Sequence, residues 1–164
     1  MSSSLNATLI RFEGSVHGWL VLHSITALRI SMGAVFVVFG ALKYFPGVSP
    51  AQDLTVTTID LITFGLVPAT PALILTATLE CLIGLGLLVG RGLRTTVYLL
   101  AVQLLGILSP LLVLPDRLFS GPHHAPTLEG QYVLKDLILV AAAMVIATRF
   151  RGARITTSPD PVSP

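Results

Sequence analysis

A group of polar and charged side chains stands at the start of one of the most apolar segments of this sequence. The stretch PTLEGQYVLKDL, residues 126–137, is followed directly by ILVAAAMVIAT. On a helix, Tyr132, Lys135 and Asp136 would share one face, because residues three and four apart are neighbours. Paired charges rarely face lipid, so we expect this face to turn inward, towards Lys43 in another segment.

These side chains could form the polar rim of a pocket for a quinone or another small molecule. Tyr and Gln side chains can hydrogen-bond a quinone carbonyl, and a Lys ammonium can stabilise a developing anion. The alternative is an interfacial anchor, in which Lys135 extends its ammonium to the membrane surface and Tyr132 belongs to the aromatic belt. The candidate pocket residues are Lys43, Glu129, Gln131, Tyr132, Lys135 and Asp136.

A second polar group lies deeper in the apolar segments. Arg29, Glu80 and Gln103 each stand ten residues from the expected cytoplasmic end of a different segment, about 15 Å deep at a rise of 1.5 Å per residue. Buried charges require partners, so we expect Arg29 to pair with Glu80, and Gln103 to satisfy the remaining donors and acceptors. This layer could fix the helix register alone, or it could be the midplane site of a transporter.

Two further residue types are poorly placed for metal or redox chemistry. His123 and His124, in GPHHAP, are weak metal candidates, because adjacent histidines outside a helix diverge and no third ligand stands at a recognisable interval. Cys81 is the single cysteine, which excludes an intrachain disulfide, a CxxC pair and a four-cysteine metal site. We therefore expect no resident metal, and any electrons that move here must be carried by a partner.

The composition is that of a membrane protein. Hydrophobic residues make up 53% of the 164 residues and charged residues 11%, and the mean hydropathy of +0.85 is far outside the soluble range. The net charge is only +2 and no run of basic residues is present, which excludes a nucleic-acid partner.

Four segments are long and apolar enough to cross a bilayer, which takes about 20 residues. They predict an all-α, up-down bundle of four transmembrane helices, because the short GRGLR hinge forces the second and third spans to run antiparallel. A short interfacial helix is expected between the first and second spans, and Ser109-Pro110 should kink the third. Gly86 and Gly90 form a small-residue pair suited to close helix packing. The expected spans are residues 19–45, 71–89, 93–114 and 132–150.

The distribution of Lys and Arg predicts the orientation of the bundle. Residues 1–18 form an N-terminal tail, residues 19–150 the membrane domain, and residues 151–164 a C-terminal tail whose Pro and Ser content predicts disorder. Six arginines in the tails and the hinge outweigh the basic residues on the other side, so both termini should be cytoplasmic and the candidate pocket should lie near the outer face. The six are Arg11, Arg91, Arg94, Arg149, Arg151 and Arg154.

Three stretches resemble a known family of membrane proteins. They are LRISMGAVFVVFGALKYFPGVSPAQDL, LECLIGLGLLVG and PTLEGQYVLKDLILVAAAMVI, and the similarity extends over residues 28–149. They resemble the DoxX-like family, specifically its YkgB branch, which includes a reactive-chlorine-resistance protein. The resemblance implies a four-helix protein of the bacterial inner membrane, linked to redox chemistry or oxidative stress. DoxX-named relatives include a subunit associated with a thiosulfate:quinone oxidoreductase, but the resemblance assigns no catalytic residue.

Together these features favour an accessory subunit of a redox or oxidative-stress-linked membrane complex. It would carry a quinone or small-molecule pocket near its outer face and have no enzymatic activity of its own. The alternatives are a small proton-coupled transporter that uses Arg29, Glu80 and Gln103, and a non-catalytic scaffold. The expected partners are the lipid bilayer, a membrane oxidoreductase and, for a transporter with enough internal volume, a second copy of the chain in a homodimer.

Overall fold

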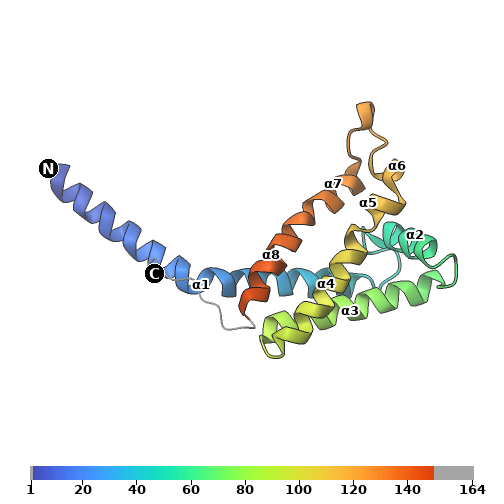
Figure 1. The fold of residues 1–164 in the computed structure, drawn as a ribbon, viewed down its shortest axis with the longest axis horizontal. Helices are drawn as coiled ribbons and strands as arrows, with labels where there is room; N and C mark the ends of the chain where they lie inside the picture. The colour runs from blue at the N-terminus through green and yellow to red at the C-terminus, as the bar shows by residue number, and fades with distance from the viewer. Residues whose placement is uncertain (1, 150–164) are drawn as a thin grey trace, which may run out of the picture.

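The structure is a computed structural model that describes residues 2–149, with side chains from residue 9 onward. The described residues form helices and contain no strand, which confirms the predicted all-α class. The predicted short helix between the first and second spans is present as α2 (Figure 1). The elements are α1 (Ser2–Leu42), α2 (Gln52–Ile62), α3 (Ala69–Val89), α4 (Leu93–Leu108), α5 (Pro110–Val113), α6 (Pro115–Leu118), the 3-10 helix η1 (Pro122–His124), α7 (Leu128–Lys135) and α8 (Leu137–Thr148).

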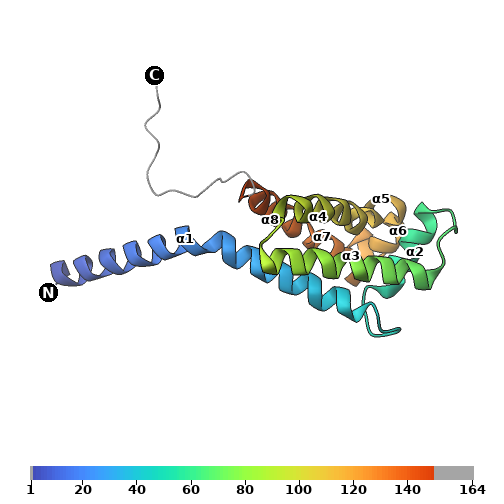
Figure 2. The ribbon, with the colours of Figure 1, turned by 90° about the horizontal axis from the view of Figure 1, so that it is seen from below.

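Four helical segments are long and apolar enough to cross a membrane, and they pack into the predicted up-down bundle (Figures 1 and 2). The third segment consists of α4 and α5, and the fourth includes η1, α7 and α8. We call the end of the bundle at the α3–α4 turn the hinge end, and the opposite end, where α2 lies, the α2 end. The segments are Leu9–Leu42, Ala69–Val89, Leu93–Val113 and Pro122–Thr148.

Helix α1 is longer than a bilayer is thick. Its 41 residues extend over about 60 Å at 1.5 Å per residue, twice the roughly 30 Å of a hydrocarbon core. Its C-terminal part packs along α3 and α8, and its N-terminal part projects beyond the hinge end (Figures 1 and 2). The described residues of the predicted tail 1–18 therefore continue the first span as a helix, and the predicted tail 151–164 lies outside the described residues.

The apolar core lies between α1, α3, α4 and α8, from the hinge end to the middle of the bundle. Several of its side chains have no exposed surface at all, so this half of the bundle is closed to water. The buried core residues are Met32, Phe36, Ile83, Leu87, Leu100, Leu104, Ala142 and Ile146.

Helices α1 and α3 approach closely because small residues face each other along their contact. A Cβ atom built on Gly84 would lie 2.6 Å from Val37 Cγ2 and 2.7 Å from the carbonyl oxygen of Gly33. A Cβ atom on Gly40 would lie 2.9 Å from the Cβ atom of Glu80. These contacts leave no room for side chains, and they fix the register of α1 against α3.

The predicted glycine pair and the predicted kink are found in the second and third spans. Gly86 packs against the side chain of Thr96 in α4, and Gly90 ends α3 in the left-handed conformation, with φ 72°. The third span breaks at Ser109, because Pro110 has no N–H to continue the helical hydrogen bonds. The break lies beside the pocket described below.

Substitution of Gly84 by Ala tests whether the close approach of α1 and α3 holds the bundle together. The new methyl group would meet backbone atoms of α1, so we expect a loss of stability of about 1–3 kcal/mol, although Ala favours helix more than Gly does. Thermal unfolding of the purified protein in detergent measures the effect.

Gly106→Ala is the control, since a Cβ atom at Gly106 would have no heavy atom within 4 Å. Equal unfolding temperatures for the two variants would contradict the packing described.

Candidate ligand pocket

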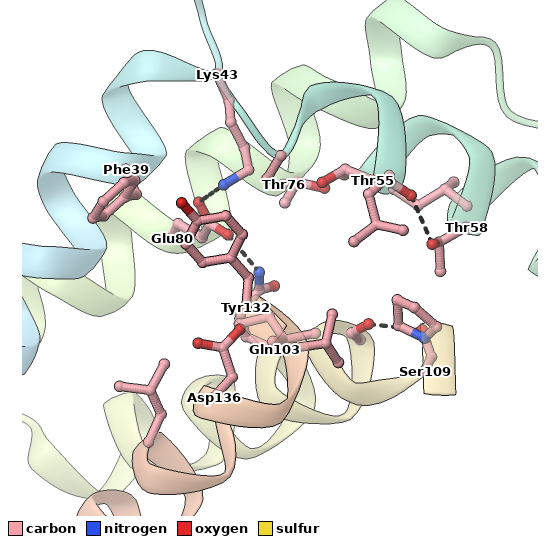
Figure 3. A pocket seen from close by; sticks show the side chains of 18 of the residues that line it. Phe39, Lys43, Thr55, Thr58, Thr76, Glu80, Gln103, Ser109, Tyr132 and Asp136 are labelled. Carbon is pink, nitrogen blue, oxygen red and sulfur yellow. Dashed lines mark hydrogen bonds and ion pairs between the residues drawn. The ribbon is translucent and has the colours of Figure 1, made fainter. Parts of the chain in front are cut away.

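A buried ion pair joins α1 to α3. Lys43 Nζ lies 2.6 Å from Glu80 Oε2, and the two side chains are only 6% and 7% exposed. Gln103 Nε2 of α4 donates a hydrogen bond of 2.9 Å to Glu80 Oε1 (Figure 3). Each oxygen of the carboxylate therefore has a donor, as a charge buried at membrane depth requires. The predicted contact between Gln103 and Glu80 is present.

The predicted pair between Arg29 and Glu80 is wrong. Arg29 Nη1 donates hydrogen bonds to the carbonyl oxygens of Leu87 and Leu88, in the last turn of α3, where the helix dipole is negative. The glycine contacts fix a register in which Glu80 lies beside the C-terminal end of α1, next to Lys43. Arg29 precedes Lys43 by about 21 Å along α1, and depths counted from the expected helix ends cannot reveal this register.

At the α2 end, Arg117 joins three elements. Its guanidinium donates two hydrogen bonds of 2.6 Å to the carboxylate of Glu129 in α7. It donates another of 2.5 Å to Asp53 Oδ2 and one of 3.2 Å to Thr57 Oγ1, both in α2. The hydrogen bonds to Glu129 and Asp53 raise the pKa of Arg117, which stays charged. These four residues, the Arg117 cluster, tie α2, α6 and α7 together.

The Arg117 cluster was missed by sequence reasoning. Arg117 stands in a proline-rich connection outside the expected spans, where the sequence does not indicate which residues it contacts. The available signal was charge balance, because Asp53 and Glu129 are expected on the same side of the membrane as Arg117 and lack another cation nearby in sequence.

A cavity of about 550 Å³ lies beneath α2, within the half of the bundle that the apolar core does not fill. Side chains from α1, α2, α3, α4, α7 and α8 line it, and most of the wall is apolar. Figure 3 shows the hydrogen-bonded series Lys43, Glu80 and Gln103, and Tyr132 and Asp136 of the fourth span line the same cavity. Among the apolar lining residues are Val35, Phe36, Phe39, Leu54, Ile59 and Ile107.

Four of the six predicted pocket residues line this cavity. They are Lys43, Glu129, Tyr132 and Asp136. The predicted inward placement of Gln131 and Lys135 is wrong, because both are exposed and neither lines the cavity. Tyr132 and Asp136 are about one turn apart and share the inner face of the helix, whereas Lys135 is rotated from Asp136 by about 100°. Lys135 Nζ instead lies 5.8 Å from the centre of the Tyr132 ring, in a cation–π contact.

The cavity opens on the flank of the bundle between α1 and α7. Val35 and Phe39 of α1 and Tyr132 of α7 line it and are nevertheless 43%, 49% and 55% exposed. Figure 1 shows that α7 diverges from α1 and α3, whereas α8 packs against α1 and α4. Because these residues belong to segments long and apolar enough to cross a membrane, we infer that the opening faces lipid.

The two histidines of the connection between the third and fourth spans lie away from the cavity. His123 and His124 are exposed in η1, with positive φ angles of 55° and 61°. Across residues 2–149, no three His, Cys, Asp or Glu side chains are grouped so that they could hold a metal ion.

Four apolar spans around a cavity that opens to lipid define a multi-pass, all-α membrane protein. The family model described as DoxX matches residues 24–113, more than half of the chain, and the protein belongs to the DoxX family. This match includes Lys43, Glu80 and Gln103, whereas the Arg117 cluster and the fourth span lie partly or wholly beyond it. No match was found among curated proteins or among solved structures.

Lys43→Met and Glu80→Gln test the buried ion pair. Each single substitution leaves one charge buried without its partner, so we expect each to lower the free energy of unfolding by about 3–5 kcal/mol. The double variant should lose much less than the sum of the two, because it removes both charges. Denaturant unfolding in detergent micelles measures this coupling.

The matched control combines Arg29→Met with Glu80→Gln. Arg29 contacts backbone carbonyls of α3 and not the Glu80 carboxylate, so these two effects should add. Strong coupling of Glu80 to Arg29, with none to Lys43, would overturn the pairing reported above.

Arg117→Met should loosen α2, because it removes the bonds that hold α2 to α6 and α7. We expect faster hydrogen–deuterium exchange in residues 52–62 and in the first turn of α7. Arg94→Met, at an exposed position on α4, is the control and should leave both segments unchanged. Unchanged exchange in the Arg117 variant would contradict the bridging role.

Proposed function

We propose that this protein is an accessory subunit of a membrane complex linked to redox chemistry or oxidative stress, and that its pocket binds a quinone-type lipid. The observation that carries the proposal is the cavity itself. Its volume lies within the roughly 300–1,000 Å³ of small-molecule sites, its wall is mainly apolar, and a few polar groups converge in it. A quinone-type lipid likewise combines polar and apolar parts, because its ring carries polar groups and its tail is apolar.

The lateral opening supports a ligand that arrives from the membrane. A tail could leave between Phe39 and Tyr132 into lipid while the head group stays among the polar residues. The Tyr132 hydroxyl can donate a hydrogen bond to a ring carbonyl, and Lys43 lines the same cavity. A water-soluble ligand would gain nothing from this opening.

The redox groups that the chain contains support the accessory role. With Cys81 as the single cysteine, the chain cannot supply a dithiol of its own to reduce or oxidise a quinone. The electrons would then pass through a partner oxidoreductase, as the resemblance to DoxX-named relatives implies. We place both termini in the cytoplasm, because Arg91 and Arg94 are exposed at the hinge end, whereas Arg117 at the other end is neutralised by two acids.

A proton-coupled transporter is the second candidate, favoured by the charged groups Lys43, Glu80 and Asp136 in one membrane cavity. Transport would need a path from this cavity to the hinge end. The apolar core fills that path, and Arg29 is bound to the end of α3 instead of to Glu80. A binding pocket with access from one side agrees better with this arrangement.

Filling the cavity tests the proposed function. Protein purified from membranes in a mild detergent should retain quinone that organic extraction and mass spectrometry detect. Thr55→Trp, which places an indole in the cavity, should lower the quinone-to-protein ratio several-fold. Thr95→Trp, at an exposed position on α4, should retain the wild-type ratio.

The same preparations show whether the protein is a subunit, because a partner oxidoreductase should co-purify with it. A wild-type protein that retains no quinone would contradict the proposed ligand. Equal quinone-to-protein ratios in Thr55→Trp and Thr95→Trp would contradict the proposal that the quinone binds in this cavity.

A further inference from the structure

The polar groups of the pocket differ in whether the protein already satisfies them. The Lys43 ammonium and both oxygens of Glu80 are bound to each other or to Gln103, and the ion-paired side chains are almost fully buried. The carboxylate of Asp136 lines the same cavity, yet it forms no ion pair and caps no helix within the described residues. Asp136 is therefore the charged group of the cavity that is available to a ligand.

Two neutral side chains of the cavity also have groups available for hydrogen bonds with a ligand. One N–H of the Gln103 amide is donated to Glu80, and the oxygen of the same amide can accept a hydrogen bond from a group in the cavity. The Tyr132 hydroxyl, which can donate or accept, has no hydrogen-bond partner among the residues described. Among the charged side chains that line the cavity, the one without an ion pair in the described residues is therefore an acceptor, Asp136.

This arrangement matches one oxidation state of a quinone-type ring better than the other. The oxidised ring carries two carbonyl oxygens, which only accept hydrogen bonds and therefore cannot form one with the Asp136 carboxylate. The reduced ring carries two hydroxyl groups, which can donate to Asp136 and to the Gln103 oxygen. A hydrogen bond to a charged acceptor is among the stronger ones in proteins, and an unpaired buried acceptor is costly.

The geometry points to a pocket that selects the reduced, hydroxyl-bearing form of its ligand through Asp136. This inference rests on the proposed function, and it adds which form of the ligand the site holds. A stronger affinity for the quinol also raises the midpoint potential of the bound couple, by about 30 mV for each tenfold difference in affinity between the two forms. The site would thus hold quinol as the product of a quinone-reducing partner or as the substrate of a quinol-oxidising one.

Equilibrium dialysis with a short-chain ubiquinone and with its chemically reduced quinol tests the inference on the purified full-length protein. The wild type should bind the quinol about tenfold to a hundredfold more tightly than the quinone, the range expected for one hydrogen bond to a charged group. Asp136→Asn should remove this preference or reverse it, because the new amide can donate to a carbonyl. Asp116→Asn, at an exposed carboxylate of α6 outside the cavity, should keep the wild-type preference.

The outcomes separate the inference from the function on which it rests. If the wild type binds both forms equally, or prefers the quinone, the selectivity is wrong while the quinone pocket stands. If the wild type prefers the quinol and Asp136→Asn keeps that preference, the role of Asp136 is wrong. If neither form binds, the proposed ligand fails together with the inference. The wild-type ratio remains decisive should Asp136→Asn not fold, which circular dichroism and size-exclusion chromatography would reveal.

Discussion

The bundle is organised around one carboxylate in the middle of a membrane-spanning helix. A charged side chain at such a position costs roughly 2.5–3.5 kcal/mol on insertion scales, unless it is paired. Lys43 and Gln103 each supply a donor to Glu80, and they can do so only if α1 and α4 keep one register against α3. The close glycine contacts between α1 and α3 permit that register, and the same register carries Arg29 to the carbonyl end of α3.

The fourth span takes no part in neutralising Glu80, and the cavity follows from this. Helix α8 packs on the apolar core with α1 and α4, whereas α7 is held at the α2 end through Glu129 and Arg117. The span is therefore fixed at both ends by contacts that do not draw its middle against α1. The cavity left between α1 and α7 is closed by α2 at the α2 end of the bundle and is open towards lipid.

The sequence predicts what depends on local pattern. Apolar length and the hinge give the four spans, Pro110 gives the break in the third, and helical spacing places Tyr132 and Asp136 on one face. The sequence does not predict the contacts that depend on the axial register of one helix against another. The partner of Glu80 is set by glycine contacts between two separate helices. Lys135 is wrongly predicted on the inner face because the prediction treats a helical spacing of three residues as equivalent to a spacing of four.

Two of the three acids that line the cavity, Glu80 and Asp136, play different physical roles. Glu80 is buried and bonded through both oxygens, so its charge is offset by stabilising contacts between three helices. Asp136 has the same chemistry and a position in a membrane-spanning segment, but its carboxylate forms no ion pair and caps no helix within the described residues. A charge at membrane depth that stabilises no helix contact lowers the stability of the fold. This cost is offset when another group in the cavity donates a hydrogen bond to the charge. Asp136 is thus best explained by the ligand, and Glu80 by the fold.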